Sequence, residues 1–520
     1  MVGCRRPLFQ LHFADSGWKA TRLGRYHAQA TLQENAAVTL PSFRRIAVIA
    51  LGALSLAHCA SNPVSGGKDF VLMSEQQELQ LGAQAHQDVL KEYAALDKPG
   101  LQAYVNDIGQ KLAKHSHRPN LQWTFTVLDS PDVNAFALPG GYVYITRGLM
   151  AYLNSEAELA GVLGHEIGHV TARHGVRQQS ASTAAGLGAV LGSILVPGMN
   201  NQAGAGMMQS VAQAWTAGYG RDHELESDRL GAQYLAKTGY DPQAMIAVIG
   251  VLKNQELFAA EQAKREGREP RSYHGTFDTH PSNDARLKQV VDEANQYRVA
   301  QPREGRTEYL QKMDGVVFGD SPAQGVIRNN LLLHDKLGLA IQFPPDWNVL
   351  NRPDRVEARS PQGDAMAELQ QGPKNDQPLA TLQNGLKLDA GARYDSGKLS
   401  GYPAAFAAGT QQGKPVVVAA VVFNGTQYMI AGMTKDKPAY DRERATLRGV
   451  INSFHAITPA ERLAARPYVL KLVTAKAGTT MAGLAKTSPL AHDAESQLRL
   501  LNNLYPAGEP KPGQSLKIVQ

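Results

Sequence analysis

Cysteine is almost absent from this chain of 520 residues, which contains only Cys4 and Cys59. So few cysteines exclude a disulfide framework as the organising principle of the fold. Long apolar runs are also missing, since none reaches the roughly twenty residues that a membrane-spanning helix needs. The net charge is small for this length, at +6, and no long run of lysine and arginine occurs. We therefore expect a globular protein that does not bind nucleic acid.

A short apolar segment lies near the start of the chain. Two arginines precede an uncharged apolar run from Ile46 to Leu56, which has the length of a signal-peptide core. Together with Cys59, this segment resembles a bacterial lipoprotein signal. The resemblance implies that 40–58 is a signal peptide and that lipidated Cys59 anchors the mature chain to a membrane in the periplasm of a Gram-negative bacterium. We expect that membrane to be the outer one, and 1–39 to be an extension ahead of the true start.

Apolar spacing divides the first three hundred residues into helices and a few strands. We expect helices over 74–116, 155–174, 221–237 and 281–299, and strands over 123–127 and 142–146. Between two of these helices lies a glycine- and alanine-rich insert over 180–220, for which a lid, a membrane-dipping loop and a helical hairpin all remain open.

The rest of the chain has a different character. Residues 301–330 are polar and irregular, which predicts a linker. A β-rich α+β domain is expected over 331–457, where Asn424-Gly425 predicts a hairpin turn. A small unit is expected over 466–520. The predicted fold class is therefore α+β.

The stretch LGHEIGHVTARH, from Leu163 to His174, contains the strongest motif. His165 and His169 are four residues apart and share one helical face, as two zinc-binding imidazoles of an HExxH motif do. Glu166 lies between them and can take a proton from water. On a continuing helix, His174 would point away from this face, and we exclude it as a ligand. It is expected to be a surface or supporting group.

A carboxylate is expected to complete the metal site. Glu224 and Asp228, in the stretch RDHELESDRLG, share a helical face and are the candidates. Glu226 and His223 are rivals, but their spacing directs them away from that face.

The stretch from Glu224 to Asp228 resembles the ExxAD motif of M48 metallopeptidases, with serine in place of alanine. This resemblance implies a mainly helical, zincin-like metalloprotease domain with a small sheet over 59–300. It further implies one zinc ion bound by His165, His169 and Glu224, supported by Asp228 and Arg221.

Two further stretches resemble the same family. THPSNDAR contains His280, which the resemblance implies is catalytic, through the carbonyl or the oxyanion, or is a fourth ligand in a latent state. NAFALPGGYVYITRG resembles the strand that binds an extended substrate, and implies contacts from Asn134, Ala135, Gly141 and Tyr142.

The regions after the metal motifs carry weaker resemblances. LGLAIQFPPDW within 331–457 resembles PsbP/Mog1-type α+β domains, which predicts an interaction or scaffolding role. Gly478, Leu501-Asn502 and Pro512-Gly513-Gln514 resemble a LysM module of βααβ order, which implies peptidoglycan as a partner. A plain structural cap is the alternative for this unit.

Three functions compete at this point. The first is a lipid-anchored zinc endopeptidase that cleaves misfolded or unassembled envelope proteins. The second is a peptidoglycan-crosslink endopeptidase tethered by the LysM-like module. The third is a binding protein with a structural zinc ion, against which the intact Glu166 argues.

Overall fold

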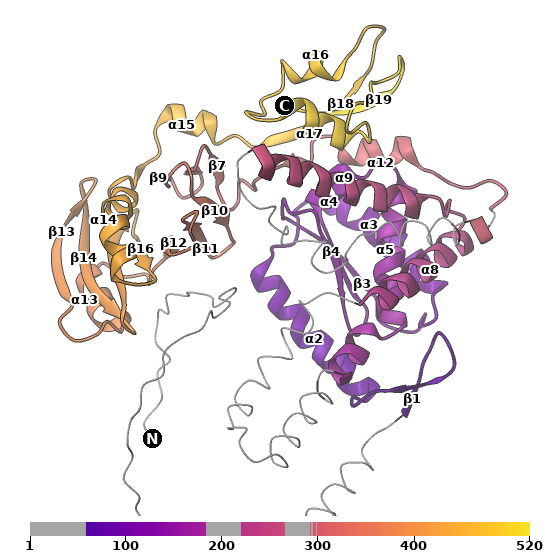
Figure 1. Cartoon of the computed structure of the whole chain (residues 1–520), viewed down its shortest axis with the longest axis horizontal. Coiled ribbons are helices and arrows are strands. Elements are labelled where there is room, and N and C mark those ends of the chain that lie inside the picture. The colour runs from indigo at the N-terminus through magenta and orange to yellow at the C-terminus, as the bar shows by residue number, and fades with distance from the viewer. Residues whose placement is uncertain (1–58, 182, 184–219, 266–291, 293–294, 298) are drawn as a thin grey trace, which may run out of the picture. The chain divides into compact units, whose positions relative to one another are not determined.

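The structure is a computed structural model, and it describes residues 59–181, 183, 220–265, 292, 295–297 and 299–520 (Figure 1). These residues form two compact units. The larger unit comprises His58–Ala340, Asn351–Asp354 and His455–Gln520. The smaller unit comprises, within the described residues, Ile341–Leu350 and Arg355–Phe454. Both units mix helices and strands, which confirms the predicted α+β class.

The larger unit begins with the elements that surround the metal motifs. They are β1 (Cys59–Ser61), β2 (Lys68–Phe70), α2 (Glu75–Glu92), α3 (Pro99–Lys114), β3 (Thr124–Leu128), β4 (Ala135–Leu138), β5 (Tyr142–Thr146), α4 (Arg147–Tyr152), α5 (Glu156–Thr171), α8 (Arg221–Lys237) and α9 (Ala244–Arg265). The predicted helix over 74–116 is two helices, because Pro99 begins a new one. The helix predicted over 281–299 falls largely outside the described residues.

A three-stranded sheet of order β3-β5-β4 lies beside α5. Strand β5 is the central strand and pairs in parallel with β3 and antiparallel with β4. It leads directly into α4, where the hydroxyl of Thr146 accepts the amide hydrogen of Leu149 at 3.1 Å. Helix α5 follows at once, so the sheet sets the starting point of the helix that carries the HExxH motif.

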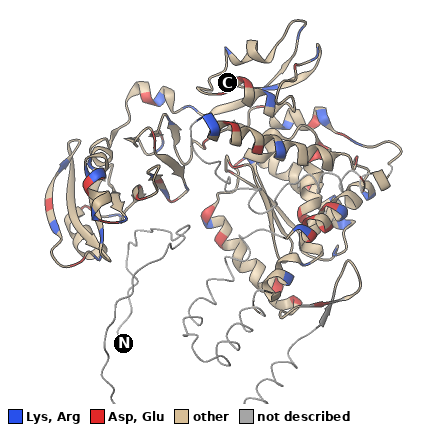
Figure 2. Cartoon of the chain, viewed as in Figure 1, with Lys and Arg blue, Asp and Glu red and all other residues tan. Residues whose placement is uncertain are grey.

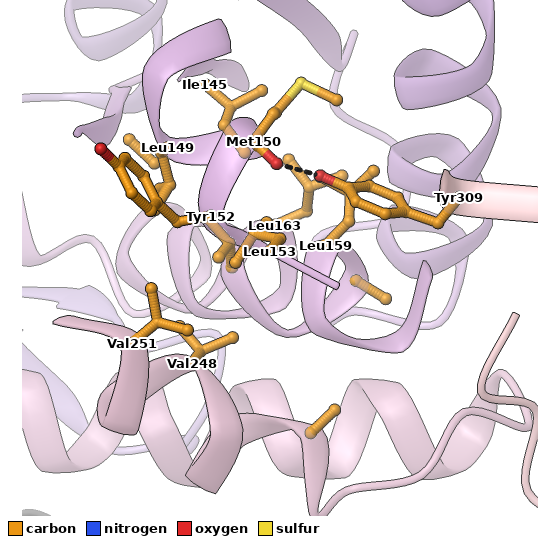
Figure 3. Packing of buried hydrophobic residues seen from close by; sticks show 14 of the residues in the cluster. Ile145, Leu149, Met150, Tyr152, Leu153, Leu159, Leu163, Val248, Val251 and Tyr309 are labelled. Carbon is orange, nitrogen blue, oxygen red and sulfur yellow. Dashed lines mark hydrogen bonds between the residues drawn. The ribbon is translucent and has the colours of Figure 1, made fainter. Parts of the chain in front are cut away.

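Helix α5 is buried along its whole length. Its apolar side chains pack against α4 and α9, as the close view in Figure 3 shows for Leu159, Leu163 and Val248. A helix surrounded by other elements can hold a polar site in a water-poor interior, where the site's side chains must satisfy one another.

The linker predicted for 301–330 is wrong. Helix α12 (Arg306–Met313) lies there, and its Tyr309 is fully buried and donates a hydrogen bond to the Met150 carbonyl at 2.6 Å (Figure 3). Strand β6 (Val317–Phe318) follows and pairs with a C-terminal strand. The error arose because the apolar face of α12 is short and surrounded by polar residues.

The C-terminal residues have the predicted βααβ order, and we call 466–520 the C-terminal module. Its elements are β18 (Tyr468–Thr474), α16 (Met481–Ala485), α17 (Ala494–Leu501) and β19 (Ser515–Val519). Strand β18 pairs with both β19 and β6. Lys517 is fully buried, and its ammonium donates to the carbonyls of Ala151 and Leu153 at 2.6 and 2.5 Å. The C-terminal module therefore packs against the rest of the larger unit at the end of α4, just before α5 begins.

Four further strands form a small sheet of order β17-β9-β8-β7. They are β7 (Val326–Arg328), β8 (Leu331–His334), β9 (Leu339–Gln342) and β17 (His455–Ala456), and helix α15 (Pro459–Ala464) follows them. Residues 331–340 thus belong to the larger unit, and the accessory domain predicted over 331–457 begins about ten residues later than expected.

The smaller unit is built around a seven-stranded antiparallel sheet. Its elements are β10 (Asn348–Asn351), β11 (Arg355–Arg359), β12 (Ala365–Gln371), α13 (Pro378–Gly385), β13 (Arg393–Leu399), β14 (Tyr402–Gln411), β15 (Lys414–Phe423), β16 (Thr426–Thr434) and α14 (Lys437–Asn452). The hairpin predicted at Asn424-Gly425 is confirmed, since both residues have positive φ and join β15 to β16.

No helix among the described residues combines the length and the apolar character needed to cross a membrane. Figure 2 shows that acidic and basic residues are interspersed along the helices of the described part.

Candidate metal centre

Helix α5 positions the HExxH side chains. The Ser155 hydroxyl caps it by accepting the amide hydrogen of Glu158 at 3.1 Å. The Glu158 carboxylate in turn accepts the amide hydrogen of Asn154 at 2.7 Å, one residue before the amide that a capping box would use. The cap fixes where the helix starts and hence which face carries His165 and His169.

His165, His169 and Glu224 bring ligand atoms together in the buried interior, as the spacing predicts. The two Nε2 atoms are 2.9 Å apart, and the Glu224 carboxylate oxygens lie 3.5 Å from His165 Nε2 and 3.3 Å from His169 Nε2. One ligand atom from each of the three lies within 4.8 Å of the others. Two ligands held tetrahedrally by one zinc ion at about 2.0–2.2 Å are about 3.3–3.6 Å apart. The two distances from the carboxylate to the imidazoles fall in this range, and the two Nε2 atoms, at 2.9 Å, would move apart by about 0.4 Å to bind zinc together. The donor set, two imidazole nitrogens and one carboxylate, is one that zinc takes.

Glycines allow the two ligand-bearing helices to approach closely. A Cβ on Gly168 would lie 3.0 Å from the Cα of Ser227, and one on Gly231 would lie 3.1 Å from the backbone nitrogen of His165. Such contacts are too short for a side chain, so α5 and α8 meet backbone to backbone. Close packing of this kind is what brings Glu224 within reach of His165 and His169.

Asp228 holds the ring of His165. Its carboxylate lies 2.8 Å from His165 Nδ1, on the side of the ring away from the other ligands. A carboxylate at Nδ1 keeps the proton there and leaves the Nε2 lone pair directed at the metal position. The predicted supporting role of Asp228 agrees with this geometry.

His169 has a different support, which the sequence analysis did not assign. Its Nδ1 lies 2.9 Å from Nδ1 of His174, and Nε2 of His174 lies 3.0 Å from the Glu226 carboxylate. With the His169 proton on Nδ1, the proton of His174 is on Nε2 and is donated to Glu226. Burial lowers the pKa of His174, and the bond from His174 holds the pKa of Glu226 at about 2.

Glu226 is not a ligand, as expected, but it supports the site through His174. His174 is fully buried, so of the two alternatives for it, a surface group or a supporting group, the structure agrees with the second. It reaches His169 although the spacing of a continuing helix would direct it away. The reason is that α5 does not continue: it ends at Thr171, and Arg173 adopts a left-handed backbone with φ of 57°. The turn at Arg173 brings His174 back to His169. His223 stacks on the His174 ring at 4.2 Å.

A buried ion cluster holds this turn and was missed by sequence reasoning. Glu78 of α2 is 1% exposed and pairs with Arg118 at 2.6 Å and Arg173 at 2.8 Å. Arg118 also donates to the Val170 carbonyl at 3.3 Å. Buried charges persist only when paired in this way. No local pattern could have revealed the cluster, because its members come from distant parts of the chain.

Arg221, predicted to support a ligand, does not do so among the described residues. It is exposed at the first position of α8. The arginine that does reach the site is Arg177, which lies 3.1 Å from Glu226.

Glu166 is 2% exposed and lines a small apolar cavity of about 30 Å³. His165 and Ala135 line the same cavity, together with apolar residues of α4, α5 and α9. A carboxylate in an apolar, water-poor hollow beside the metal ligands is well placed to transfer a proton.

The predicted substrate-binding residues fall on two strands with different roles. Gly141 and Tyr142 belong to the turn and central strand β5, whose backbone is already paired: Gly141 accepts from Thr124 at 2.9 Å. They cannot also pair with a peptide, which corrects that prediction. Among the described residues, β4 is the edge strand.

The register of β4 shows which of its residues face outward. The Asn134 carbonyl accepts the amide hydrogen of Thr146 at 3.0 Å, so the backbone of Asn134 faces β5 and not the outer edge. Bonding alternates along an antiparallel pair, so Ala135 and Ala137 direct their backbone groups outward. Ala137, which is half-buried, therefore replaces Asn134. Ala135 also faces outward by register, but it is 1% exposed and its backbone is covered in this structure.

Several predicted features lie outside the described residues. They are His280, the signal segment 40–58, the extension 1–39 and nearly all of the insert over 180–220. Cys59 is the first residue of β1, whose backbone pairs with β2.

Comparison with known proteins shows similarity to one family of peptidases. The model of peptidase family M48 matches residues 99–294. The beta-barrel assembly-enhancing protease of Escherichia coli (strain K12) is 31% identical over 291 residues, which cover 54% of this chain and 56% of that protein. The mitochondrial metalloendopeptidase OMA1 of Arabidopsis thaliana is 33% identical over 29% of this chain and 30% of its own length. The chain thus spans about half the length of the curated relatives it matches.

The chain was also compared with solved structures. The solution structure of cyanobacterial PsbP (CyanoP) from Synechocystis sp. PCC 6803 is similar over 26% of this chain and 96% of that one, at 12% identity and a TM-score of 0.20.

Proposed function

Residues 99–294 form a domain of peptidase family M48, and on this premise we propose that the chain is a zinc-dependent endopeptidase. One observation carries the proposal: the ligand atoms of His165, His169 and Glu224 converge within 4.8 Å. The far nitrogen of each imidazole is held by a buried partner, Asp228 or His174. Such contacts fix the orientation of each imidazole, as the ligands of a metal ion require.

The chain's own residues would divide the chemistry as follows. A bound zinc ion would polarise a peptide carbonyl and acidify water. Glu166 would accept a proton from the attacking water and deliver it to the leaving amine nitrogen. The buried surroundings of Glu166 would exclude other water and strengthen these electrostatic effects. The Glu224 carboxylate would complete the ligand set and leave one position open for the reaction.

The substrate would bind as an extended peptide along β4. The outward backbone groups of Ala137 would pair with it as a further strand. Recognition through the backbone is independent of sequence, which suits unfolded segments of many proteins. His280 would polarise the carbonyl or occupy the fourth zinc position in a latent state.

We further propose that the substrates are misfolded or unassembled proteins of the bacterial envelope. The name of the beta-barrel assembly-enhancing protease, a relative at 31% identity, supports this direction. The lipoprotein-like segment before Cys59 supports a periplasmic location, with a lipid anchor in the outer membrane. The LysM-like pattern of the C-terminal module keeps peptidoglycan as a second candidate substrate or partner.

The test separates protein from peptidoglycan cleavage. Purified full-length chain with zinc is incubated with casein and, in parallel, with purified sacculi. We expect casein fragments and no release of muropeptides. Muropeptide release without casein cleavage would overturn the proposal in favour of a peptidoglycan-crosslink endopeptidase.

A further inference from the structure

A second hollow lies in the larger unit, away from the metal ligands. It has a volume of about 410 Å³, within the range of ligand sites. Three parts of the unit line it: α4 and the segment before β4, the residues around β6 and β7, and the C-terminal module. We call it the junction pocket. Because the module contributes part of its wall, the pocket exists only where the module packs on the peptidase domain.

The charge of the junction pocket has one sign. Arg147, Arg328 and His492 line it, and no aspartate or glutamate is among its lining residues. The Arg328 guanidinium donates to the carbonyls of Ile327 and Arg466, each at 3.1 Å. Among the described residues, no carboxylate lies within ion-pair distance of Arg328. Asp320, which does not line the pocket, is the carboxylate that interacts electrostatically with both Arg328 and Arg147. The wall itself therefore presents cations only, and a half-buried guanidinium in a concave wall favours an anionic ligand.

Arg147 adds a second positive group to the wall. It is 1% exposed; its Nε pairs with Asp129 at 2.5 Å and its Nη1 donates to the Val317 carbonyl at 3.3 Å. Its Nη2 has no hydrogen-bond partner in the described part of the chain, but this atom has no accessible surface and cannot contact a ligand in the hollow. Direct contact with an anion therefore falls to Arg328, and Arg147 contributes only to the electrostatic potential of the wall.

The remaining wall of the junction pocket is aromatic. Tyr152 and Phe318 meet edge to face at 6.3 Å, and the Arg328 guanidinium lies 3.9 Å above the ring of Tyr468. The Tyr152 hydroxyl is held by Gln497 of the module at 3.0 Å. Such walls take a large apolar or aromatic group beside the anion.

The pocket is also close to the proposed active site. Leu149 of α4 lines the cavity that holds Glu166, whereas Gly148 and Tyr152 of the same short helix line the junction pocket. The two hollows therefore lie within about one helix diameter, roughly 10–12 Å, of each other. The junction pocket and the cavity at Glu166 are thus separated by helix α4.

From these observations we propose that the junction pocket binds polypeptide substrates through a carboxylate next to a large apolar side chain. The carboxylate is either the C-terminus of a chain or an aspartate or glutamate within it. The inference rests on the proposed endopeptidase function for the choice of a polypeptide over other anions. It assigns the C-terminal module a share in substrate binding.

The test measures binding and not cleavage. Full-length chain carrying Glu166→Gln is titrated with three peptides: acetyl-Ala-Ala-Phe with a free carboxylate, its C-terminal amide, and acetyl-Ala-Asp-Phe-amide. We expect the free acid to bind about tenfold more tightly than the neutral amide, as a charge-assisted contact predicts. Binding of the third peptide shows whether an internal carboxylate also serves.

Two variants locate the binding. Arg328→Gln should remove the preference for the free acid, and Leu490→Trp, which fills the pocket wall, should weaken every peptide. Arg448→Gln is the matched control, because it removes the same charge from an exposed residue that does not line the pocket. Equal binding of acid and amide, an unchanged preference in Arg328→Gln, or displacement of the peptide by soluble peptidoglycan fragments would overturn the proposal. Casein cleavage by the wild-type chain is measured separately. Loss of peptide binding with casein still cleaved would refute only the junction pocket, whereas absence of casein cleavage would refute the proposed endopeptidase function.

Discussion

Replacing His174 by phenylalanine tests how the chain holds its metal. The substitution keeps a ring of similar size stacked on His223, and it keeps the charge of Glu226. What it removes is the acceptor that lies 2.9 Å from His169 Nδ1. Without that acceptor, the proton of neutral His169 is free to occupy Nε2, where it competes directly with the metal.

The size of the effect follows from the burial of this contact. His169 and His174 are 2% and 0% exposed, so water cannot replace the lost acceptor. Leaving a buried donor unsatisfied costs about 1–3 kcal/mol, which corresponds to roughly 5- to 150-fold in an equilibrium constant. Loss of such supporting contacts typically costs about 10–100-fold in metal affinity. We therefore expect zinc to bind about 10–100-fold more weakly.

The assay is competition for zinc between the full-length protein and a fluorescent chelator. The matched control is His117→Phe, the same change at a ring whose Nδ1 contacts Tyr234 at 2.7 Å and not a metal ligand. The control should change zinc affinity by no more than about twofold. Unaltered affinity in His174→Phe, with both variants folded by circular dichroism, would refute the assignment of His174 as the support of His169.

Three other expectations follow from the packing. Gly168→Ala should lower the free energy of unfolding by about 1–3 kcal/mol in thermal unfolding, because its Cβ would lie 3.0 Å from the backbone of α8. Gly161→Ala is the control: its nearest contact is 3.4 Å away, so this change should be neutral or stabilising. Equal effects of the two changes would contradict the close approach of α5 and α8. Ala137→Pro should slow casein cleavage without loss of bound zinc, because the amide of Ala137 faces the outer edge of the sheet. Phe136→Pro should instead destabilise the fold, because the amide of Phe136 faces β5. Unchanged cleavage by the Ala137→Pro variant would exclude β4 as the substrate strand. Burial lowers the pKa of Lys517 to about 7, so above about pH 7 the unfolded state binds a proton that the folded state has released. Wild-type stability against urea should therefore rise from about pH 7 to about pH 9, and Lys517→Met should lack this rise; parallel curves would show that Lys517 does not titrate as its burial implies.

The ligand set could be predicted from the sequence because it depends on helical spacing. His165 and His169 are one turn apart, as are Glu224 and Asp228, and both pairs lie on helices with clear apolar faces. Only the packing of α5 against α8 depends on residues far apart in the chain, and it was predicted from the family resemblance.

Apart from Asp228, the contacts that support the ligands could not be predicted, because they depend on residues far apart in the chain. His174 reaches His169 only because Arg173 turns the chain, and Glu78 on α2 holds Arg173 from 95 positions away. Lys517 is similar, since a lysine in a C-terminal strand reads as exposed until the carbonyls that receive it are known. The helix in the predicted linker was missed because its buried side, around Tyr309, is too short to show a period.

The most direct test of the central claim is Glu166→Gln, measured for zinc and for cleavage together. The account predicts that this variant retains one zinc ion per chain by elemental analysis and loses casein cleavage, because Glu166 moves the proton and does not hold the metal. Cleavage of unfolded casein at the wild-type rate by the zinc-loaded variant would contradict it.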